Sequence, residues 1–348
     1  MYPKGYLNSK GFRGPSTTRE FSRIRTCTIC AGSFFINMSW RIVYIEESEY
    51  LSLYLDNLKV LKNDEEYLIP INDIHTIILD NYKTKLSVHL INALTKSNVN
   101  FVICGIDHLP QTIVLPHSGH KLSFQMLNKQ LAWSKNLKAI IHKFIIKNKI
   151  RNQRDLLKQL NMNEYTIEIL ENYINDIQLG DKTNREGLSA KVYFRELFGS
   201  KFLRFDDDVI NAGLNYGYAI LRSQITKVLV AKGLNTSIAF FHIGRENEFN
   251  LSDDIIEPFR PIIDYWVYKN LLEEEIFLRE HRLNIIKFTT GKAYIENKHQ
   301  TIFNAIKIYV DNILNYCETK NEKILKDIII KYDDIWFHEI DCIFRFTS

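Results

Sequence analysis

The chain has 348 residues, of which 45% are hydrophobic and 25% charged, a composition typical of a globular protein of about two domains. No apolar run approaches the roughly 20 residues that a membrane-spanning helix needs. Five cysteines, an odd number scattered along the chain, argue against a disulfide scaffold and indicate a reducing compartment. We therefore expect a cytoplasmic protein without a membrane partner.

The net charge of +4 is unevenly distributed. Residues 1–37 carry six basic residues and one acid, which leaves 39 basic and 40 acidic residues in the remainder. This segment is rich in Arg, Ser, Thr and Gly and has no sustained helical or strand period, so we expect a disordered extension before a natural start at Met38. Its CxxC motif, Cys27 to Cys30, lacks the second ligand pair of a closed zinc site.

Residues 38–115 show short runs of β type. Arg41–Ile45 is one such run, and Tyr50–Leu61 alternates around a turn signal at Asp56-Asn57 that favours a hairpin. One helical pattern, residues 87–94, precedes the strand-like residues 101–104. We predict a small β-rich domain here, followed by a Pro- and Gly-containing linker at residues 109–120.

The rest of the chain, residues 121–348, is predicted to be a larger all-α catalytic domain, so the fold class is α+β. Residues 121–154 carry nine basic residues and no acid on a helical pattern. The apolar period predicts further helices at 155–179 (a pair broken near residue 161), 186–198, 208–232, 254–280, 299–317 and 321–332.

Candidate metal ligands lie in two segments of this helical part. Glu186 falls in the first turn of a predicted helix that Asn184 would cap. Downstream, His242 is followed by Asp254 and Glu257, which at i and i+3 can point at one spot. An imidazole with two or three carboxylates suits Mg²⁺ or Mn²⁺, which phosphoryl-transfer enzymes use.

Each of these residues also has a purely structural interpretation. Glu186 alone could simply favour a helix N-terminus, and His242 could be a hydrogen-bonded core histidine. Asp254 and Glu257 could belong to a solvated helix start that Ser252 or Asp253 caps. Pro258 could end one turn or open the next helix. Arg245 and Arg260 could bind phosphate, and Arg260 could equally brace Glu257 or Asp264.

Three motifs in order resemble the CRISPR-associated spacer-acquisition integrases, the Cas-one family, and most closely its type II subgroup. They are Asn184-Arg-Glu-Gly187 with Ala190-Lys-Val-Tyr-Phe194, then His242, then Asn250-Leu-Ser-Asp-Asp-Ile-Ile-Glu-Pro-Phe-Arg-Pro261. Lys147-Asn-Lys-Ile-Arg-Asn-Gln153 resembles another segment of that subgroup. Phe241 stands where relatives often have a second histidine, and Ile243 stands where a basic residue is expected.

The resemblance implies an enzyme that joins the 3′-hydroxyl ends of foreign DNA fragments to the CRISPR repeat by metal-assisted transesterification, with endonuclease side activity. Glu186, His242 and Glu257 would hold one Mg²⁺ or Mn²⁺, with Asp254 in an auxiliary role. It also implies a homodimer that joins a small Cas-two protein in a heterohexameric complex on double-stranded DNA. A stand-alone metal-dependent nuclease and a non-catalytic DNA-binding scaffold remain the alternatives.

The acid-free basic stretch at residues 121–154 is the candidate DNA-binding surface. Because it has an apolar period, we expect most of its lysines on one solvent-facing side, where Lys138, Lys143 and Lys147 would contact phosphates. The alternative is a face that only keeps the protein in solution. The two arginines near the acidic motif, Arg245 and Arg260, are the other predicted DNA contacts.

Overall fold

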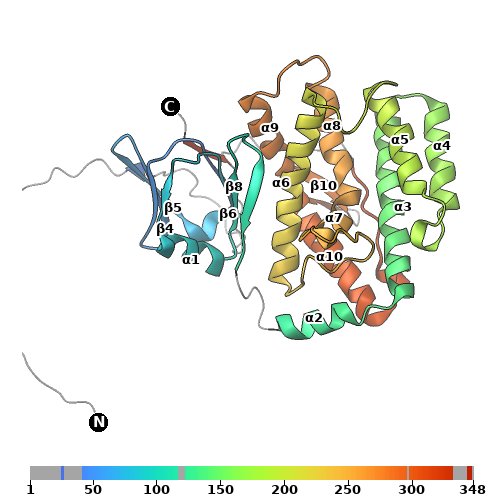
Figure 1. Ribbon diagram of the computed structural model, residues 1–348, viewed down its shortest axis with the longest axis horizontal. Helices are drawn as coiled ribbons and strands as arrows, with labels where there is room; N and C mark the ends of the chain where they lie inside the picture. Colours follow the sequence, from blue (N-terminus) through green and yellow to red (C-terminus); the bar gives the residue numbers. More distant parts are fainter. Residues whose placement is uncertain (1–24, 27–40, 117–121, 296–297, 332–342, 347–348) are drawn as a thin grey trace, which may run out of the picture.

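The computed structural model describes residues 25–26, 41–116, 122–295, 298–331 and 343–346 (Figure 1). A smaller β-rich part lies beside a larger helical part, which confirms the predicted α+β class. Met38 and the CxxC motif lie outside the described residues. So does the predicted extension, except for Arg25–Thr26, which form β1 and pair in parallel with β5.

Two tight hairpins form the middle of the first sheet, whose strand order is β1-β5-β4-β3-β7. Its longer strands are β3 (Tyr50–Tyr54), β4 (Asn57–Lys62) and β5 (Glu65–Pro70), and β7 is Lys85–Leu86. Both central residues of each turn, residues 55–56 and 63–64, have positive φ, as a type I′ turn requires. The hairpin predicted near Asp56 is therefore confirmed.

The second sheet, with strand order β12-β2-β6-β8-β9, separates two hydrophobic cores. Its strands are β2 (Arg41–Ile45), β6 (Ile74–Leu79), β8 (Asn100–Cys104), β9 (Pro110–Val114) and β12 (Ile343–Phe346). Ile42 and Tyr44 belong to the core of the helical part, whereas Val43 and Ile45 pack in a core with the first sheet and α1 (Val88–Lys96). Burial on both faces explains why β2 is apolar from Ile42 onward.

In the helical part, α6 (Val209–Ala231) faces the β-rich part and packs against α7, α8, α9 and α10 (Figure 1). The α-helices of this part are α2 (Ser123–Leu131), α3 (Lys135–Gln159), α4 (Glu164–Asp176), α5 (Arg185–Phe198), α7 (Asn250–Ile256), α8 (Arg260–Asn270), α9 (Arg279–Thr289) and α10 (Ile302–Thr319). Short 3₁₀ turns lie at Ile71–Asp73, Leu179–Asp181, Glu257–Phe259 and Glu322–Ile324, and the hairpin β10 (Lys292–Ile295) and β11 (Lys298–Thr301) precedes α10. At the crossing of α6 and α8, a Cβ on Gly217 would lie 2.4 Å from Ile263 Cγ2, so the close approach requires glycine.

Buried polar contacts join α6 to the second sheet. Asn100 Nδ2 donates to Ser223 Oγ at 3.0 Å, and Gln224 Nε2 donates to Thr76 Oγ1 at 2.9 Å. Lys227 Nζ donates to a backbone carbonyl of β6 at 3.0 Å. Because buried polar groups stabilise only when they find such partners, these bonds fix how the two parts meet.

Three predicted helix boundaries are wrong. The helix predicted at 254–280 is interrupted between α8 and α9, where Leu272 and Ile276 keep the apolar period although they are exposed. Residues 321–331 hold only a 3₁₀ turn, and the buried Ile328 and Ile330 flank an exposed residue, a period of two rather than 3.6. The first predicted helix of the pair at 155–179 is the end of α3.

Candidate active site

Glu186 lies in the first turn of α5, whose start is capped twice. Asn184, in the left-handed region at φ 51°, is the N-cap as predicted, and its side chain accepts a hydrogen bond from Gly187 N at 3.2 Å. The Asp181 carboxylate accepts from the backbone N–H groups of Arg185 and Glu186 at 2.8 and 2.9 Å. These bonds satisfy donors at the helix end and so hold Glu186 in a defined place.

Lys149, near the middle of α3, joins two of the predicted ligands. Its Nζ lies 2.8 Å from Glu186 Oε1 and 2.6 Å from Glu257 Oε2. Burial disfavours the charged form of Lys149, but the two carboxylates outweigh burial and raise its pKa. Burial likewise opposes ionisation of Glu186, yet the Lys149 ammonium holds the pKa of that carboxyl well below its usual range.

Glu257 is 3% exposed and lies in the 3₁₀ turn that joins α7 to α8. Pro258 therefore sits inside a continuous helical segment, and its carbonyl accepts a 2.8 Å hydrogen bond from Asn152 of α3. Arg260 Nε donates to Glu257 Oε1 at 3.0 Å, which is one of the two roles predicted for this arginine. Burial would raise the pKa of Glu257, but the charges of Arg260 and Lys149 bring it below its usual value.

Arg260 is itself held by a stack of side chains. Its guanidinium carbon lies 4.5 Å from the Tyr218 ring centroid, and that of Arg204 lies 5.3 Å from the same centroid. Asp264 accepts hydrogen bonds from the hydroxyls of Tyr218 and Tyr193. Burial raises the pKa of Asp264 to about 6, although both bonds favour its ionised form. This stack fixes the arginine that binds Oε1 of Glu257.

His242 is oriented by Asp254. The fully buried Asp254 carboxylate contacts His242 Nδ1 at 2.7 Å and accepts from the backbone N–H groups of Phe240, Phe241 and His242 at 2.6, 3.2 and 3.1 Å. Burial would lower the pKa of His242, but Asp254, Glu257 and Glu186 together raise it. Asp254 thus shapes both the loop and the orientation of the ring.

The loop after His242 is defined by side-chain bonds. Asn250, the first residue of α7, accepts from Gly244 N at 3.0 Å and donates to the carbonyl of the same residue at 2.8 Å. The prediction that Ser252 or Asp253 caps this helix is wrong, because α7 begins two residues earlier than Ser252. Phe241, which stands in place of a histidine, stacks on His142 of α3 with ring centroids 3.9 Å apart.

Within the described ranges, no three His, Cys, Asp or Glu side chains form a group ready to hold a metal ion. At this site the oxygens of Glu186 and Glu257 bind the Lys149 ammonium instead. The donor set nonetheless fits a divalent cation, because one oxygen of each carboxylate already contacts the same cation, at 2.8 and 2.6 Å. When Nδ1 of the neutral ring donates to Asp254, Nε2 keeps a lone pair for a ligand.

The basic residues predicted to contact DNA are less exposed than expected. Lys143 and Lys147 are half-buried on α3, and Lys138 donates to the carbonyl of Ala239 at 3.0 Å. Arg245 is exposed in the loop after His242. The expectation of one solvent-facing basic side is wrong for residues 122–154, because several of their cations are paired or buried. Lys149 is buried. The ion pairs are Lys129 with Glu318, Arg151 with Asp327, and Arg154 with Asp155 and Glu171.

Several site residues were not predicted from the sequence, among them Lys149, Asn152, Arg204 and Tyr218. Lys149 and Asn152 lie in the segment that resembles type II integrases. The spacing of Asn148, Lys149, Asn152 and Gln153 places a buried polar stripe on α3. The resemblance of this segment to type II integrases was the available signal, because the residue type alone predicts a surface position for a lysine among eight other cations.

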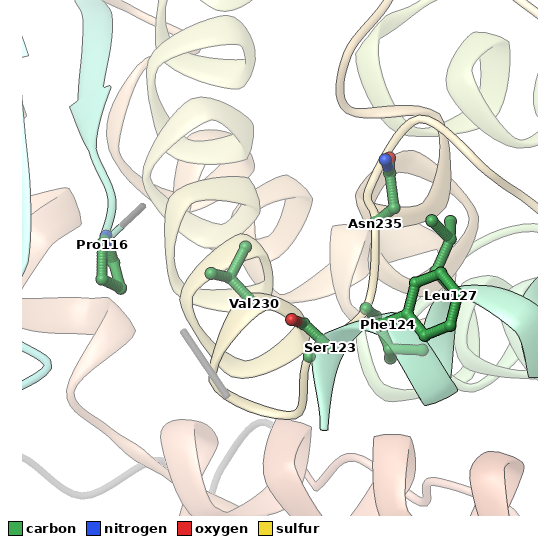
Figure 2. A pocket seen from close by; sticks show the side chains of 8 residues that line it. Pro116, Ser123, Phe124, Leu127, Val230 and Asn235 are labelled. Atoms are coloured by element: carbon green, nitrogen blue, oxygen red, sulfur yellow. The ribbon is translucent and has the colours of Figure 1, made fainter. Parts of the chain in front are cut away.

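A pocket of about 380 Å³ lies apart from these side chains. It is lined by Pro116, which follows β9, by residues of α2 such as Phe124, and by the C-terminal end of α6 with the loop that follows it, including Val230 (Figure 2). None of its lining residues is Lys149 or one of the carboxylates that contact Lys149.

Among the described helices, none is long and apolar enough to cross a membrane.

Two carboxylates that share one cation, with a histidine oriented by a third carboxylate, define a candidate metal-dependent phosphoryl-transfer site. Residues 42–284 match the family model described as CRISPR associated protein Cas1. The chain therefore belongs to the Cas1 family, as its motifs predicted.

Relatives and solved structures agree with this assignment. The CRISPR-associated endonuclease Cas1 of Neisseria meningitidis is 32% identical over 295 residues, which cover 83% of this chain and 96% of the relative. One from Francisella tularensis subsp. novicida is 25% identical over 74% of this chain and 88% of the relative. A casposase bound to its integration product (TM-score 0.66, 23% identity, 84% and 97% covered) and a Cas1 protein from Thermotoga maritima (TM-score 0.65, 14% identity, 80% and 97% covered) share the fold.

Proposed function

We propose that this chain is a CRISPR adaptation integrase that joins the 3′-hydroxyl ends of foreign DNA fragments to the repeat by transesterification. The observation that carries the proposal is the convergence of Glu186 and Glu257, from separate helices, on one cation. His242 lies beside them, and Asp254 holds its ring. Several relatives carry the name endonuclease, which fits chemistry at a phosphodiester.

Glu186, His242 and Glu257 are the residues that would hold Mg²⁺ or Mn²⁺, which when bound would polarise the scissile phosphate and stabilise the leaving oxygen. Asp254 acts through His242, because accepting the Nδ1 proton keeps the tautomer whose Nε2 can bind. Arg260 donates to Oε1 of Glu257, so Oε2 is the oxygen that contacts the Lys149 ammonium. With water in place of the 3′-hydroxyl, the same site would cut DNA, so we expect nicking and disintegration as side activities.

The proposed substrates are two duplexes, the captured fragment and the repeat. Lys138, Lys143, Lys147 and Arg245 are the proposed phosphate contacts, and Arg260 lies close enough to the site to add a second role to its bond with Glu257. Of these, Arg245 is exposed and the two lysines at 143 and 147 are half-buried on the helix that carries Lys149. Together they would place the backbone of the DNA near the carboxylates.

We further propose a homodimer that assembles with a small Cas-two protein into a heterohexamer in the cytoplasm. Two active sites are needed because a fragment has two ends to join. A solved Cas6-RT-Cas1–Cas2 complex contains a chain of the same fold, with a TM-score of 0.64 and 15% identity over 88% of this chain. The unpaired thiols of Cys104 and Cys317 suit a reducing compartment.

A strand-joining assay tests the proposal. The chain, its Cas-two partner, a labelled fragment and a supercoiled plasmid with one repeat should give a joined product in Mn²⁺. Glu186→Ala, His242→Ala and Glu257→Ala should each abolish joining, whereas Glu168→Ala, at an exposed glutamate of α4, should not. A fragment with a 3′-dideoxy end should lose joining while nicking persists. Joining by Glu186→Ala at the wild-type rate would show that the assignment is wrong.

A further inference from the structure

Lys149 occupies the position between the two proposed carboxylate ligands. It is 8% exposed, and its Nζ contacts Glu186 Oε1 at 2.8 Å and Glu257 Oε2 at 2.6 Å. A lysine ammonium has three donors and no acceptor, so it can bind both carboxylates at once. The contact joins α3 to α5 and to the turn between α7 and α8, which approach each other here (Figure 1).

The two carboxylates need a cation between them. Glu186 Oε1 and Glu257 Oε2 lie 2.8 and 2.6 Å from the same ammonium nitrogen, and Glu257 is only 3% exposed. Without a shared cation, two negative charges would repel each other in a poorly hydrated place. Arg260 does not replace Lys149, because it binds Oε1 of Glu257, and the structure gives it no bond to Glu186.

A divalent ion needs the same oxygens that Lys149 now binds. Carboxylate oxygens would lie about 2.0–2.1 Å from a bound Mg²⁺, closer than the 2.6 and 2.8 Å at which they contact the ammonium. An ammonium left in place would be only a few ångströms from a doubly charged ion and would repel it strongly. The flexible four-carbon stem of lysine allows the ammonium to move away without a change in α3.

We propose that Lys149 is the resident cation of the metal-free site, which keeps Glu186 and Glu257 together and competes with the divalent ion for their oxygens. The proposal rests on the proposed function, because it takes these two residues as metal ligands. Lys149 is thus a positioning residue: it preserves the ligand arrangement before metal arrives and weakens the affinity for the metal.

Replacing Lys149 by methionine, of similar length and without charge, separates these two effects. In metal-free buffer with EDTA, Lys149→Met should unfold at a lower temperature than the wild type, because the two carboxylates lose their shared cation. In calorimetric titration with MnCl₂ and no DNA, the variant should bind at least about tenfold more tightly, because no ammonium has to leave. Its Tm should also rise more on addition of Mn²⁺. Lys158→Met, at an exposed lysine of the same helix, should match the wild type in all three measurements.

The outcomes distinguish this inference from the function on which it rests. Equal or weaker Mn²⁺ binding by Lys149→Met, in a wild type that binds Mn²⁺, would overturn only the role of Lys149. Absence of binding in both proteins would overturn the metal site as well. If Lys149→Met alone does not fold, the double variant Lys149→Met/Glu186→Gln should fold again, because it removes the unbalanced negative charge. Failure of that rescue would also contradict the inference.

Discussion

Asp254→Asn is the substitution whose effect the structure defines most sharply. One carboxylate oxygen serves the backbone N–H groups of Phe240 and Phe241, and the other serves the backbone and ring of His242. An asparagine has the same shape but only one acceptor oxygen, so its NH₂ group must face one of these two pairs of donors. An NH₂ group turned toward Phe240 and Phe241 loses both of their bonds. Turned toward His242, it loses the backbone bond, and the ring must take the tautomer in which Nδ1 accepts and Nε2 carries the proton.

The expected loss of stability follows from these bonds. A hydrogen bond to a charged group contributes about 1.5–3 kcal/mol, so the free energy of unfolding should fall by about 1.5 kcal/mol if one bond is lost and by about 3 kcal/mol or more if two are lost. Because the entropy of unfolding is about 2.1 cal/mol/K per residue, or roughly 0.7 kcal/mol/K for 348 residues, these changes lower Tm by roughly 2–4 °C. Strand joining should fall about 10–100-fold, as is typical when the partner of a metal-binding histidine is changed, and less than in the ligand variants.

Urea unfolding and strand joining measured on the same preparation check both numbers. Asp253→Asn is the matched control, because the neighbouring carboxylate accepts a side-chain bond from Asn247 and lies 3.7 Å from Arg222. This control should change the free energy of unfolding by at most about 1 kcal/mol. An Asp254→Asn variant as stable and as active as the wild type would refute the view that this carboxylate shapes the loop and the histidine.

Three further predictions follow from the charges of the site and of α3. Without metal, the wild type should lose stability relative to His242→Gln as the pH rises above about 6.5, the ordinary pKa of histidine. The fold raises the pKa of His242, so the stabilising charge is fully present below about 6.5 and is lost at higher pH. A difference in Tm between the two proteins that stays constant from pH 6 to 9 would contradict this. In acid, Glu186→Gln should reduce the loss of stability that the wild type shows below about pH 4.5. The fold lowers the pKa of Glu186, so its ionised carboxylate stabilises the protein above the pKa of the unfolded chain and less as the pH falls. Melting temperatures of both proteins from pH 3 to 6 test this. Lys143→Gln with Lys147→Gln should weaken binding to all duplexes alike and flatten the slope of log K against log salt by about 1.8, with Lys158→Gln unchanged, and an unchanged slope would remove these lysines from the DNA path.

Local features of the fold could be predicted from the sequence. Asn184 before Glu186 is a capping pattern whose partners lie within the same turn, and the turn near Asp56 needs only its neighbours. The order and spacing of Glu186, His242 and Glu257 predicted the candidate ligands, and the structure brings Glu186 and Glu257 to one ammonium. These signals are contained in short segments, so they survive without knowledge of the fold.

Contacts between distant segments could not be predicted in this way. β12 pairs with β2 although Ile343 and Ile42 lie at opposite ends of the chain. The buried Lys149 has the residue type and neighbours of a surface lysine, and only its position between α5 and the α7–α8 turn gives it two partners. Likewise, Leu272 continues the apolar period that predicted a helix at 254–280, but its side chain is exposed.

A crystal of the chain grown or soaked in Mn²⁺ and measured at the manganese absorption edge tests the central claim most directly. We expect one anomalous peak about 2.0–2.3 Å from oxygens of Glu186 and Glu257 and from Nε2 of His242, with the Lys149 ammonium moved off both carboxylates. A peak bound elsewhere, or an ammonium still bridging Glu186 and Glu257 at saturating Mn²⁺, would contradict it.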